Sequence, residues 1–256
     1  MKEKDLLHSF IGVDLAWSGG NPSGLAAVIY DGKRAFLAAV DCRTSDEDII
    51  EWIERHARET TWVGIDAPII APNLAKTARP VDRMVTSLFG RFHAGVYPGN
   101  RERCARPIRI SEKLSLRGYS ADPFCTGFRD RRQLEVFPHL VQVALLGRTR
   151  IVKYKKGTKG EKSQGLTELQ RVIANSLPGL DPPLVSSEEL EALLDSSPRR
   201  LKGKQRKALE DKIDALLCAY MTLYFWMWGE EKCQVFGDFR TGYIIGPKIL
   251  RIEDRG

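Results

Sequence analysis

The sequence has few cysteines and no long apolar run, and each shortage excludes a class of protein. Its five cysteines are odd in number and scattered, with no Cys-x-x-Cys pair, so neither a disulfide framework nor a zinc ribbon is expected. No run of about 18 apolar residues is present, so no membrane span or membrane association is expected. Residues 1–8 are charged and lack the apolar stretch of a secretory signal, which favours a reduced, cytoplasmic location.

What the chain does have is enough apolar residues for a large core and an excess of positive charge. Of its 256 residues 43% are hydrophobic, which suits one large domain, and no internal repeat or linker divides residues 1–256. The net charge of +7 attracts polyanions such as nucleic acid, acidic lipid or nucleotides. DNA or RNA is therefore the expected partner, whereas the oligomeric state stays open.

In the first third of the chain, predicted strands and a predicted helix follow one another in an order that indicates an α/β fold. Apolar, β-branched runs at 9–16 and 61–68 suit buried strands, and two further runs flank Asp31-Gly32, a strong hairpin signal. Ser45 can cap a helix whose first turn carries acids, so the predicted order is strand, strand, strand, helix, strand.

The rest of the chain is predicted to be mainly helical. Residues 69–131, rich in proline and arginine, indicate a long insertion with helices around 80–89 and 111–117. The later expectations are a fifth strand at 132–137, helices at 139–146, 165–176, 187–195 and 204–228, and short extended pieces at 233–237 and 242–246.

Two acids each end a buried apolar strand. Burying a bare carboxylate is costly, so Asp14 and Asp66 must be paired, protonated or bound to a cation. If the two strands are parallel neighbours, both acids lie at the edge where α/β sheets bind ligands. The alternative is that each acid only caps a loop.

Three further acids can join this pair. Asp211 and Asp214 share one face of the long helix and precede its apolar part, so Asp214 lies where the helix enters the core. Glu135 lies in the short fifth strand, with sheet-edge protection as its alternative role. Four or five converging carboxylates would repel one another, and such hard oxygen ligands suit Mg²⁺ or Mn²⁺.

These motifs resemble a family of predicted RNase H-like nucleases. The resemblance is carried by Asp14 in FIGVDLAW, Asp66 in VGIDAP, Glu135 in EVFPH and Asp214 in DKIDALLCAY, and by the closing GYIIGP. It runs from about residue 9 to 248. It implies a mixed five-stranded central sheet in the order 3-2-1-4-5, flanked by helices, with the first three strands antiparallel and the insertion before the fifth.

The resemblance also implies a chemistry, which is two-metal hydrolysis of phosphodiesters. Asp14, Asp66 and Asp214 match the three metal ligands, Asp211 matches an additional helix acid of the resolvase branch, and Glu135 is an unusual fifth member. One metal activates water and the second stabilises the leaving oxygen, so no side-chain nucleophile is needed. The implied enzyme is a Mg²⁺- or Mn²⁺-dependent nuclease.

Basic residues supply candidates for nucleic-acid contact. The segment 150–162 is predicted to be an exposed loop in which Lys153, Lys155 and Lys156 follow a phosphate backbone, unless the lysines only solvate it. Arg79 and Arg83, in R-x-x-D-R, are candidates for phosphate binding near the metal edge, with an internal salt bridge as the alternative.

Two other functions are compatible with the sequence. GVDLAWSGGNPSG is similar to the first phosphate loop of actin and sugar-kinase phosphotransferases, but no second glycine-rich motif is present and the chain is short for two such domains. The other alternative is a non-catalytic nucleic-acid- or protein-binding module on the same fold.

Overall fold

The computed structural model describes residues 7–74, 76–124 and 131–249 and has a mixed α/β fold built on a six-stranded sheet. The strand order is β5-β4-β1-β2-β3-β6. β1 pairs with β2 and β2 with β3 antiparallel, whereas β1–β4, β4–β5 and β3–β6 are parallel. The strands are β1 (His8–Asp14), β2 (Ser23–Tyr30), β3 (Ala35–Arg43), β4 (Thr61–Ile65), β5 (Arg131–Glu135) and β6 (Leu184–Val185).

The prediction of a five-stranded sheet was one strand short. β6 pairs in parallel with the start of β3, where Ala35 meets Leu184 and Phe36 meets Val185. Two residues are too few to show the period-two pattern by which a strand is identified in a sequence. Only the tertiary fold, which brings this segment alongside β3, makes it a strand.

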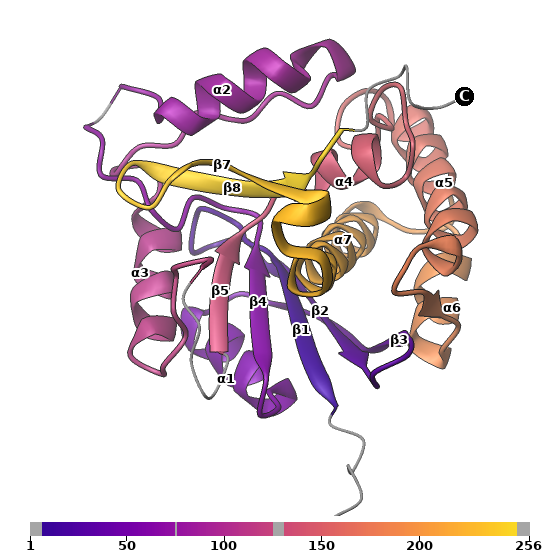
Figure 1. Ribbon diagram of the computed structural model, residues 1–256. Coiled ribbons are helices and arrows are strands. Elements are labelled where there is room, and N and C mark those ends of the chain that lie inside the picture. Colours follow the sequence, from indigo (N-terminus) through magenta and orange to yellow (C-terminus); the bar gives the residue numbers. More distant parts are fainter. Residues whose placement is uncertain (1–6, 75, 125–130, 250–256) are drawn as a thin grey trace, which may run out of the picture.

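Helices cover both faces of the sheet (Figure 1). α7 crosses one face, with α4, α5 and α6 packed against it, and α1 and α3 lie on the opposite face. Ser45 caps α1 as expected, accepting a hydrogen bond from the Asp48 backbone. The helices are α1 (Asp46–His56), α2 (Pro80–Phe89), α3 (Ala105–Ser115), α4 (Pro138–Ala144), α5 (Lys159–Ser176), α6 (Glu188–Asp195) and α7 (Gly203–Lys232), with short 3-10 turns η1 (Gly90–Phe92) and η2 (Leu177–Gly179).

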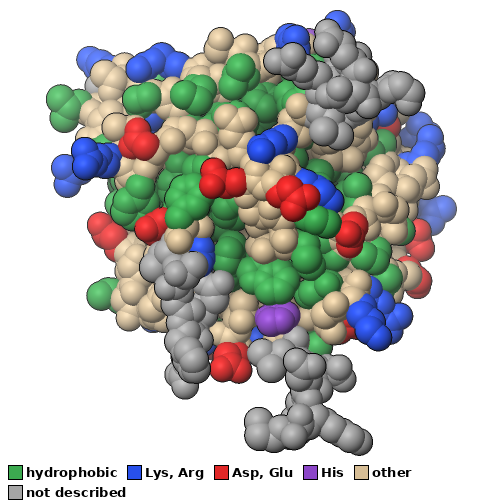
Figure 2. All heavy atoms as spheres, in the orientation of Figure 1, with side chains coloured by type: hydrophobic (Ala, Val, Ile, Leu, Met, Phe, Trp, Pro, Cys, Tyr) green, Lys and Arg blue, Asp and Glu red, His purple; other side chains and the backbone are tan. Residues whose placement is uncertain are grey.

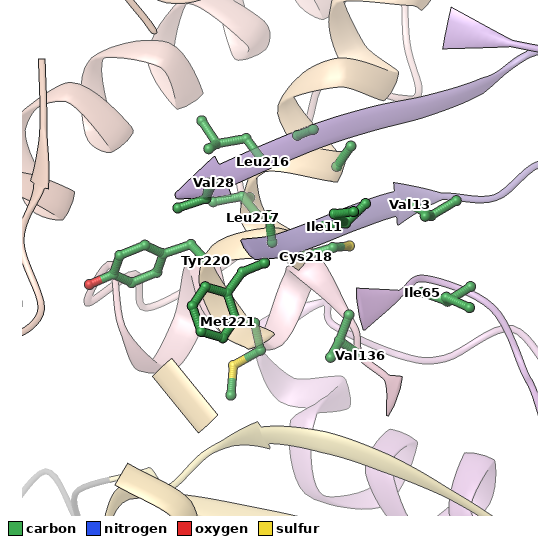
Figure 3. Packing of buried hydrophobic residues seen from close by; sticks show 14 of the residues in the cluster. Ile11, Val13, Val28, Ile65, Val136, Leu216, Leu217, Cys218, Tyr220 and Met221 are labelled. Carbon is green, nitrogen blue, oxygen red and sulfur yellow. The ribbon is translucent and has the colours of Figure 1, made fainter. Parts of the chain in front are cut away.

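α7 forms the main core with the sheet. Its apolar residues from Ala215 to Phe225 are buried among strand residues, and Figure 3 shows several of these contacts. The helix lies unusually close to the strands because glycines face it: a Cβ on Gly12 would be 1.8 Å from the Ala215 carbonyl oxygen. Gly229 breaks the helix near its end, with φ 47° and ψ −138°.

A second, smaller cluster of apolar residues lies beyond one edge of the sheet. It joins α2, α4 and the hairpin of β7 (Cys233–Asp238) and β8 (Gly242–Pro247), with Val85, Leu140 and Phe236 among its members. The insertion thus forms part of the structure around the carboxyl ends of the strands. Residues 125–130, at its end, lie outside the described residues.

Within the insertion, α3 begins six residues before the expected start. Pro107 does not delay the helix, because it is the third residue of α3. A proline is tolerated at this position, since the first four backbone N–H groups of a helix have no partner within it.

Two global features bear on partners. Among the described residues no helix combines the length and the hydropathy needed to cross a membrane. On the face shown in Figure 2, lysine and arginine side chains are dispersed, with acidic side chains between them, rather than gathered in one basic patch.

Candidate functional site

Asp14 and Asp66 lie side by side at the carboxyl ends of two parallel strands. Asp14 is the last residue of β1 and Asp66 directly follows β4, while Val13 and Ile65 are register partners. The Asp66 backbone N–H donates to the Val13 carbonyl at 2.9 Å, which extends the pairing to the acids themselves. The sheet thus holds the two carboxyl groups at one edge.

α7 brings Asp211 and Asp214 to the same edge. Gly24 on β2 is the register partner of Asp14, and a Cβ there would lie 2.1 Å from the Asp211 carbonyl oxygen. The helix therefore contacts the sheet beside Asp14. Asp211 is 2% exposed and Asp214 is fully buried. The Asp14 charge contributes to the raised pKa of Asp211, so the two carboxyl groups are electrostatic neighbours.

Burial and mutual repulsion make three of the acids, Asp14, Asp66 and Asp211, hard to ionise. Burial raises the pKa of Asp14, and it raises that of Asp66 well above the ordinary value with a further contribution from the Asp14 charge. Burial, with Asp14 as the next contributor, raises the pKa of Asp211 to about 8. Carboxyl groups that repel one another favour a bound proton or a cation, so the cluster favours added positive charge.

Two ammonium groups supply positive charge among the acids. Lys155 Nζ lies 2.7 Å from Asp214 Oδ2, and Lys207 forms an ion pair with Asp211. The Tyr154 hydroxyl donates to Asp214 Oδ1 at 2.5 Å. Burial lowers the pKa of Lys155, but the Asp214 and Asp14 charges outweigh it and raise the pKa well above the ordinary value.

Lys155, predicted to contact a nucleic-acid backbone, is partly exposed at the cavity wall and pairs with Asp214, while the segment around it is not the fully exposed loop that was expected. Val152 and Tyr154 are buried, so alternate residues of the segment face the core, and α5 already begins at Lys159. The segment also lies tightly against α5, since a Cβ on Gly165 would be 2.0 Å from the Lys153 carbonyl oxygen. The signal was the apolar alternation at 152 and 154, which the surrounding lysines obscured.

Arg79, a candidate for phosphate binding, is fully buried in an ion-pair network. Its Nη2 lies 2.6 Å from Glu135 Oε1 and 2.7 Å from Asp82 Oδ1, and its Nη1 donates to Glu135 Oε2 at 2.7 Å. The internal salt bridge, the alternative to phosphate binding, is what forms. No part of its guanidinium is left for solvent.

Glu135 stands beside the acids but is held by Arg79 through both carboxylate oxygens. Burial nevertheless raises its pKa to about 7, against the opposing effect of Arg79. Its charge also contributes to the raised pKa of Asp66, so the two are electrostatic neighbours. The structure therefore gives Glu135 a place beside the cluster and an arginine partner, rather than a free carboxylate.

Three of the predicted nucleic-acid contacts are on the surface. Arg83, Lys153 and Lys156 are exposed. Arg83 donates to the Ala78 carbonyl and keeps part of its guanidinium in solvent. These three side chains are available to a polyanion, whereas Arg79 is fully buried.

A cavity of about 420 Å³ opens onto the acids. Its walls combine charged and aromatic side chains from separate segments of the chain. They include Asp14, Asp66, Glu135 and Lys155 together with Trp17, Tyr97 and Phe137. A pocket with few polar groups among apolar walls is the usual form of a ligand site.

Carboxylate oxygens are suitable ligands for a divalent cation, although these acids are not arranged as a metal site in this structure. Among the described residues no group of three or more Asp, Glu, His or Cys side chains is arranged to hold a metal ion. Oδ2 of Asp211 and Oδ2 of Asp214 are nevertheless buried without a hydrogen-bond donor, even though Lys155 Nζ approaches the latter. Such oxygens are the ligands that Mg²⁺ and Mn²⁺ prefer.

Lys207 and Tyr154 were not identified from the sequence. Lys207 precedes Asp211 by four residues, a spacing at which opposite charges pair on a helix. This pair could therefore have been predicted from the sequence. Tyr154 gave no such signal, because its contact with Asp214 spans 60 positions. A pair of this kind forms only when the fold packs α7 against the segment that carries Tyr154.

Comparison with known families gives one finding. The family model described as "Protein of unknown function (DUF429)" matches residues 12–240, which includes the four clustered aspartates. No curated protein matches the chain.

Proposed function

The chain belongs to the DUF429 family of proteins of unknown function, and we propose that it is a metal-dependent phosphodiester hydrolase acting on nucleic acid. We further propose that its fold is RNase H-like and that residues 1–256 act as one domain. The strand order, the antiparallel start of the sheet and the acids on β1 and α7 support this assignment.

The observation that carries the proposal is that Asp14, Asp66, Asp211 and Asp214 lie close together at the carboxyl ends of β1 and β4. β1 and β4 bring the half-buried Asp14 and Asp66 to one open cavity, and α7 places Asp211 and Asp214 close to them. Evolution toward stability alone would favour apolar residues here, because even a paired buried charge often stabilises a fold less than apolar residues of similar size. The cluster is therefore best explained by a cation and an anionic substrate.

Mg²⁺ or Mn²⁺ would be held by Asp14, Asp66 and Asp214, with Asp211 in support, and would lower the pKa of a water molecule and neutralise the leaving oxygen. The protein provides the rest. Buried walls limit water around the acids, which strengthens each electrostatic interaction. Tyr154 orients the Asp214 carboxylate through its hydroxyl.

Lys155 is the residue of the chain best placed to meet the substrate. Its ammonium lies at the cavity wall against Asp214, and its side chain is 36% exposed. A phosphodiester entering the cavity brings negative charge to this ammonium, and a lysine binds phosphate oxygens as a compact point charge. We assign Lys155 to contact a non-bridging phosphate oxygen during the reaction.

Cleavage of labelled single- and double-stranded DNA and RNA with added Mg²⁺ or Mn²⁺ tests the proposal. Asp14→Asn and Asp66→Asn should each abolish cleavage, whereas Asp238→Asn, an exposed acid on β7, should cleave like the wild type. Mn²⁺ binding measured by calorimetry should be lost in Asp14→Asn.

The alternatives predict different outcomes. Mn²⁺ binding and nucleic-acid binding without cleavage of any probe would favour a non-catalytic module. Phosphate transfer from ATP in place of cleavage would favour the phosphotransferase. Cleavage that persists in Asp14→Asn would show that the acids are not the active site.

A further inference from the structure

Two aromatic side chains stand at the rim of the cavity, on loops that are far apart in the sequence. Trp17 follows β1 and Tyr97 lies between η1 and α3, and both line the cavity that contains Asp14 and Asp66. Their ring centroids are 5.8 Å apart at an angle of 70°, so neither ring is stacked face to face on the other. Tyr97 is 65% exposed, which is unfavourable for a large apolar ring.

The backbone that carries each ring is held in place by hydrogen bonds on both sides of it. The Arg106 guanidinium donates to the Ala16 and Ser18 carbonyls, at 2.7 and 2.8 Å, which flank Trp17. Arg106 is itself buried and ion-paired with Asp46. Because Arg106 is buried and bonded on both sides, it holds the loop after β1 in one position.

The loop that carries Tyr97 is held in a similar way. The Val96 N–H donates to Thr86 Oγ1 at 3.1 Å, and the Gly99 N–H donates to Asp82 Oδ2 at 2.8 Å. Asp82 belongs to the buried Arg79 network. The backbone that carries the exposed ring is therefore held by the interior of the protein, so ordering this loop on binding costs little conformational entropy.

Positive charge accompanies the aromatic rim. The Arg103 guanidinium lies 5.4 Å from the centroid of Tyr97, and the Lys155 ammonium lies on the cavity wall. Flat rings beside cations, next to a site for a phosphodiester, are the features that bind an unpaired base and its phosphate. The volume of about 420 Å³ lies within the usual range of small-molecule pockets.

We propose that Trp17 and Tyr97 form a stacking site for an unpaired nucleobase adjoining the bound phosphodiester, so that the substrate is single-stranded or locally unpaired nucleic acid. This inference rests on the proposed function, since it names the substrate class of the same site. A duplex offers its bases only at their edges and cannot stack a base on these rings without unpairing it.

The test measures binding by fluorescence anisotropy in EDTA, so that no cleavage occurs, with three probes of equal length: an oligothymidylate, an abasic oligodeoxynucleotide and a duplex. The wild type should bind the oligothymidylate at least about tenfold more tightly than the abasic strand. Repeating the titrations with Asp14→Asn, whose cavity has one acid fewer, controls for repulsion of the phosphates. An oligouridylate distinguishes RNA from DNA.

Trp17→Ala and Tyr97→Ala should each weaken oligothymidylate binding by about tenfold and leave abasic binding unchanged. Trp17→Phe and Tyr97→Phe keep a ring and should retain most of the affinity. The matched control is Phe239→Ala, which removes an aromatic ring that is 54% exposed on the turn between β7 and β8 and outside the cavity lining.

An equal weakening for the abasic and thymidylate strands, or unchanged affinity in either alanine variant, would overturn the stacking site. The outcome is separable from that of the proposed function. Metal-dependent cleavage without base-dependent binding would retain the hydrolase and reject the stacking site. Base-dependent binding without cleavage or Mn²⁺ binding would retain the stacking site as that of a nucleic-acid-binding module.

Discussion

At the scale of single residues, the clearest feature is a set of carboxyl groups buried where ionisation is unfavourable. Asp211 is the case with the most direct consequence for pH, because its pKa of about 8 in the folded protein is far above the unfolded value of 3.8. Between these values the folded state holds a proton that the unfolded state has released. The free energy of unfolding therefore falls as the pH rises from about 4 to 8.

Asp211→Asn should remove this part of the pH dependence. The free energy of unfolding of the variant minus that of the wild type should be larger at pH 8 than at pH 5. The increase should be at least about 1.4 kcal/mol, the equivalent of one pKa unit. Urea unfolding at both pH values measures the gain. The matched control is Asp195→Asn at an exposed position, and an equal gain in that control would contradict the assignment.

Arg79 is the second residue whose environment makes a sharp prediction. It neutralises Glu135 and Asp82 while fully buried, so Arg79→Ala leaves two buried carboxyl groups without their cation. We expect a decrease of about 3–5 kcal/mol in the free energy of unfolding. Arg83→Ala, four positions on and exposed, should change it by less than about 0.5 kcal/mol. Equal decreases in denaturant unfolding would mean that Arg79 contributes nothing through its burial.

At the scale of secondary-structure elements, the site depends on how closely α7 approaches the sheet. Gly12, Gly24 and Gly64 lie on three adjacent strands, and a Cβ on any of them would come within about 2 Å of an atom of α7. These close approaches involve helix backbone at Gly12 and Gly24, which cannot move aside like a flexible side chain. The glycines therefore set the distance between Asp14 and the helix acids.

Gly24→Ala tests this dependence. Forcing a methyl group against the Asp211 backbone should destabilise the fold by about 1–3 kcal/mol or more and should weaken Mn²⁺ binding, since Asp211 is displaced. Gly19→Ala is the control, because its added Cβ meets nothing within 4 Å. Unfolding curves and calorimetry for both variants suffice, and an unperturbed Gly24→Ala would show that the helix can shift without cost.

At the scale of the whole molecule, the net charge is positive, but the basic side chains on the face seen in Figure 2 are dispersed and form no single patch. Lys153 and Lys156 are exposed beside the cavity residue Lys155 and belong to the segment leading into α5. Their position suits interaction with the phosphates that flank a bound strand.

Replacing Lys153 and Lys156 together by alanine should weaken nucleic-acid binding similarly for all sequences, because interactions with phosphate carry no base information. For a single strand, the slope of log affinity against log salt should flatten by roughly 0.7 for each phosphate that the variant no longer neutralises. Lys204→Ala, at the exposed start of α7, is the control. Unchanged slopes in the double variant would mean that these lysines only solvate the surface.

The sequence by itself determined the local elements and the identity of the acids. Apolar runs predicted β1 and β4, the Asp-Gly turn predicted the β2–β3 hairpin, and Ser45 predicted the start of α1, because each signal lies within a few residues. It also indicated Asp14, Asp66, Asp211 and Asp214, since a carboxylate at the end of a buried element always requires an explanation.

Only the tertiary structure decided which charges meet. Arg79 pairs with Glu135 across 56 positions, and Lys155 and Tyr154 both reach Asp214 across about 60, so no spacing rule predicts these three contacts. The two-residue strand β6 and the paired rings of Trp17 and Tyr97 depend equally on segments brought together by folding. The physical reason is that burial and long-range electrostatics are properties of packed elements, whereas the sequence expresses directly only what neighbouring residues do to one another.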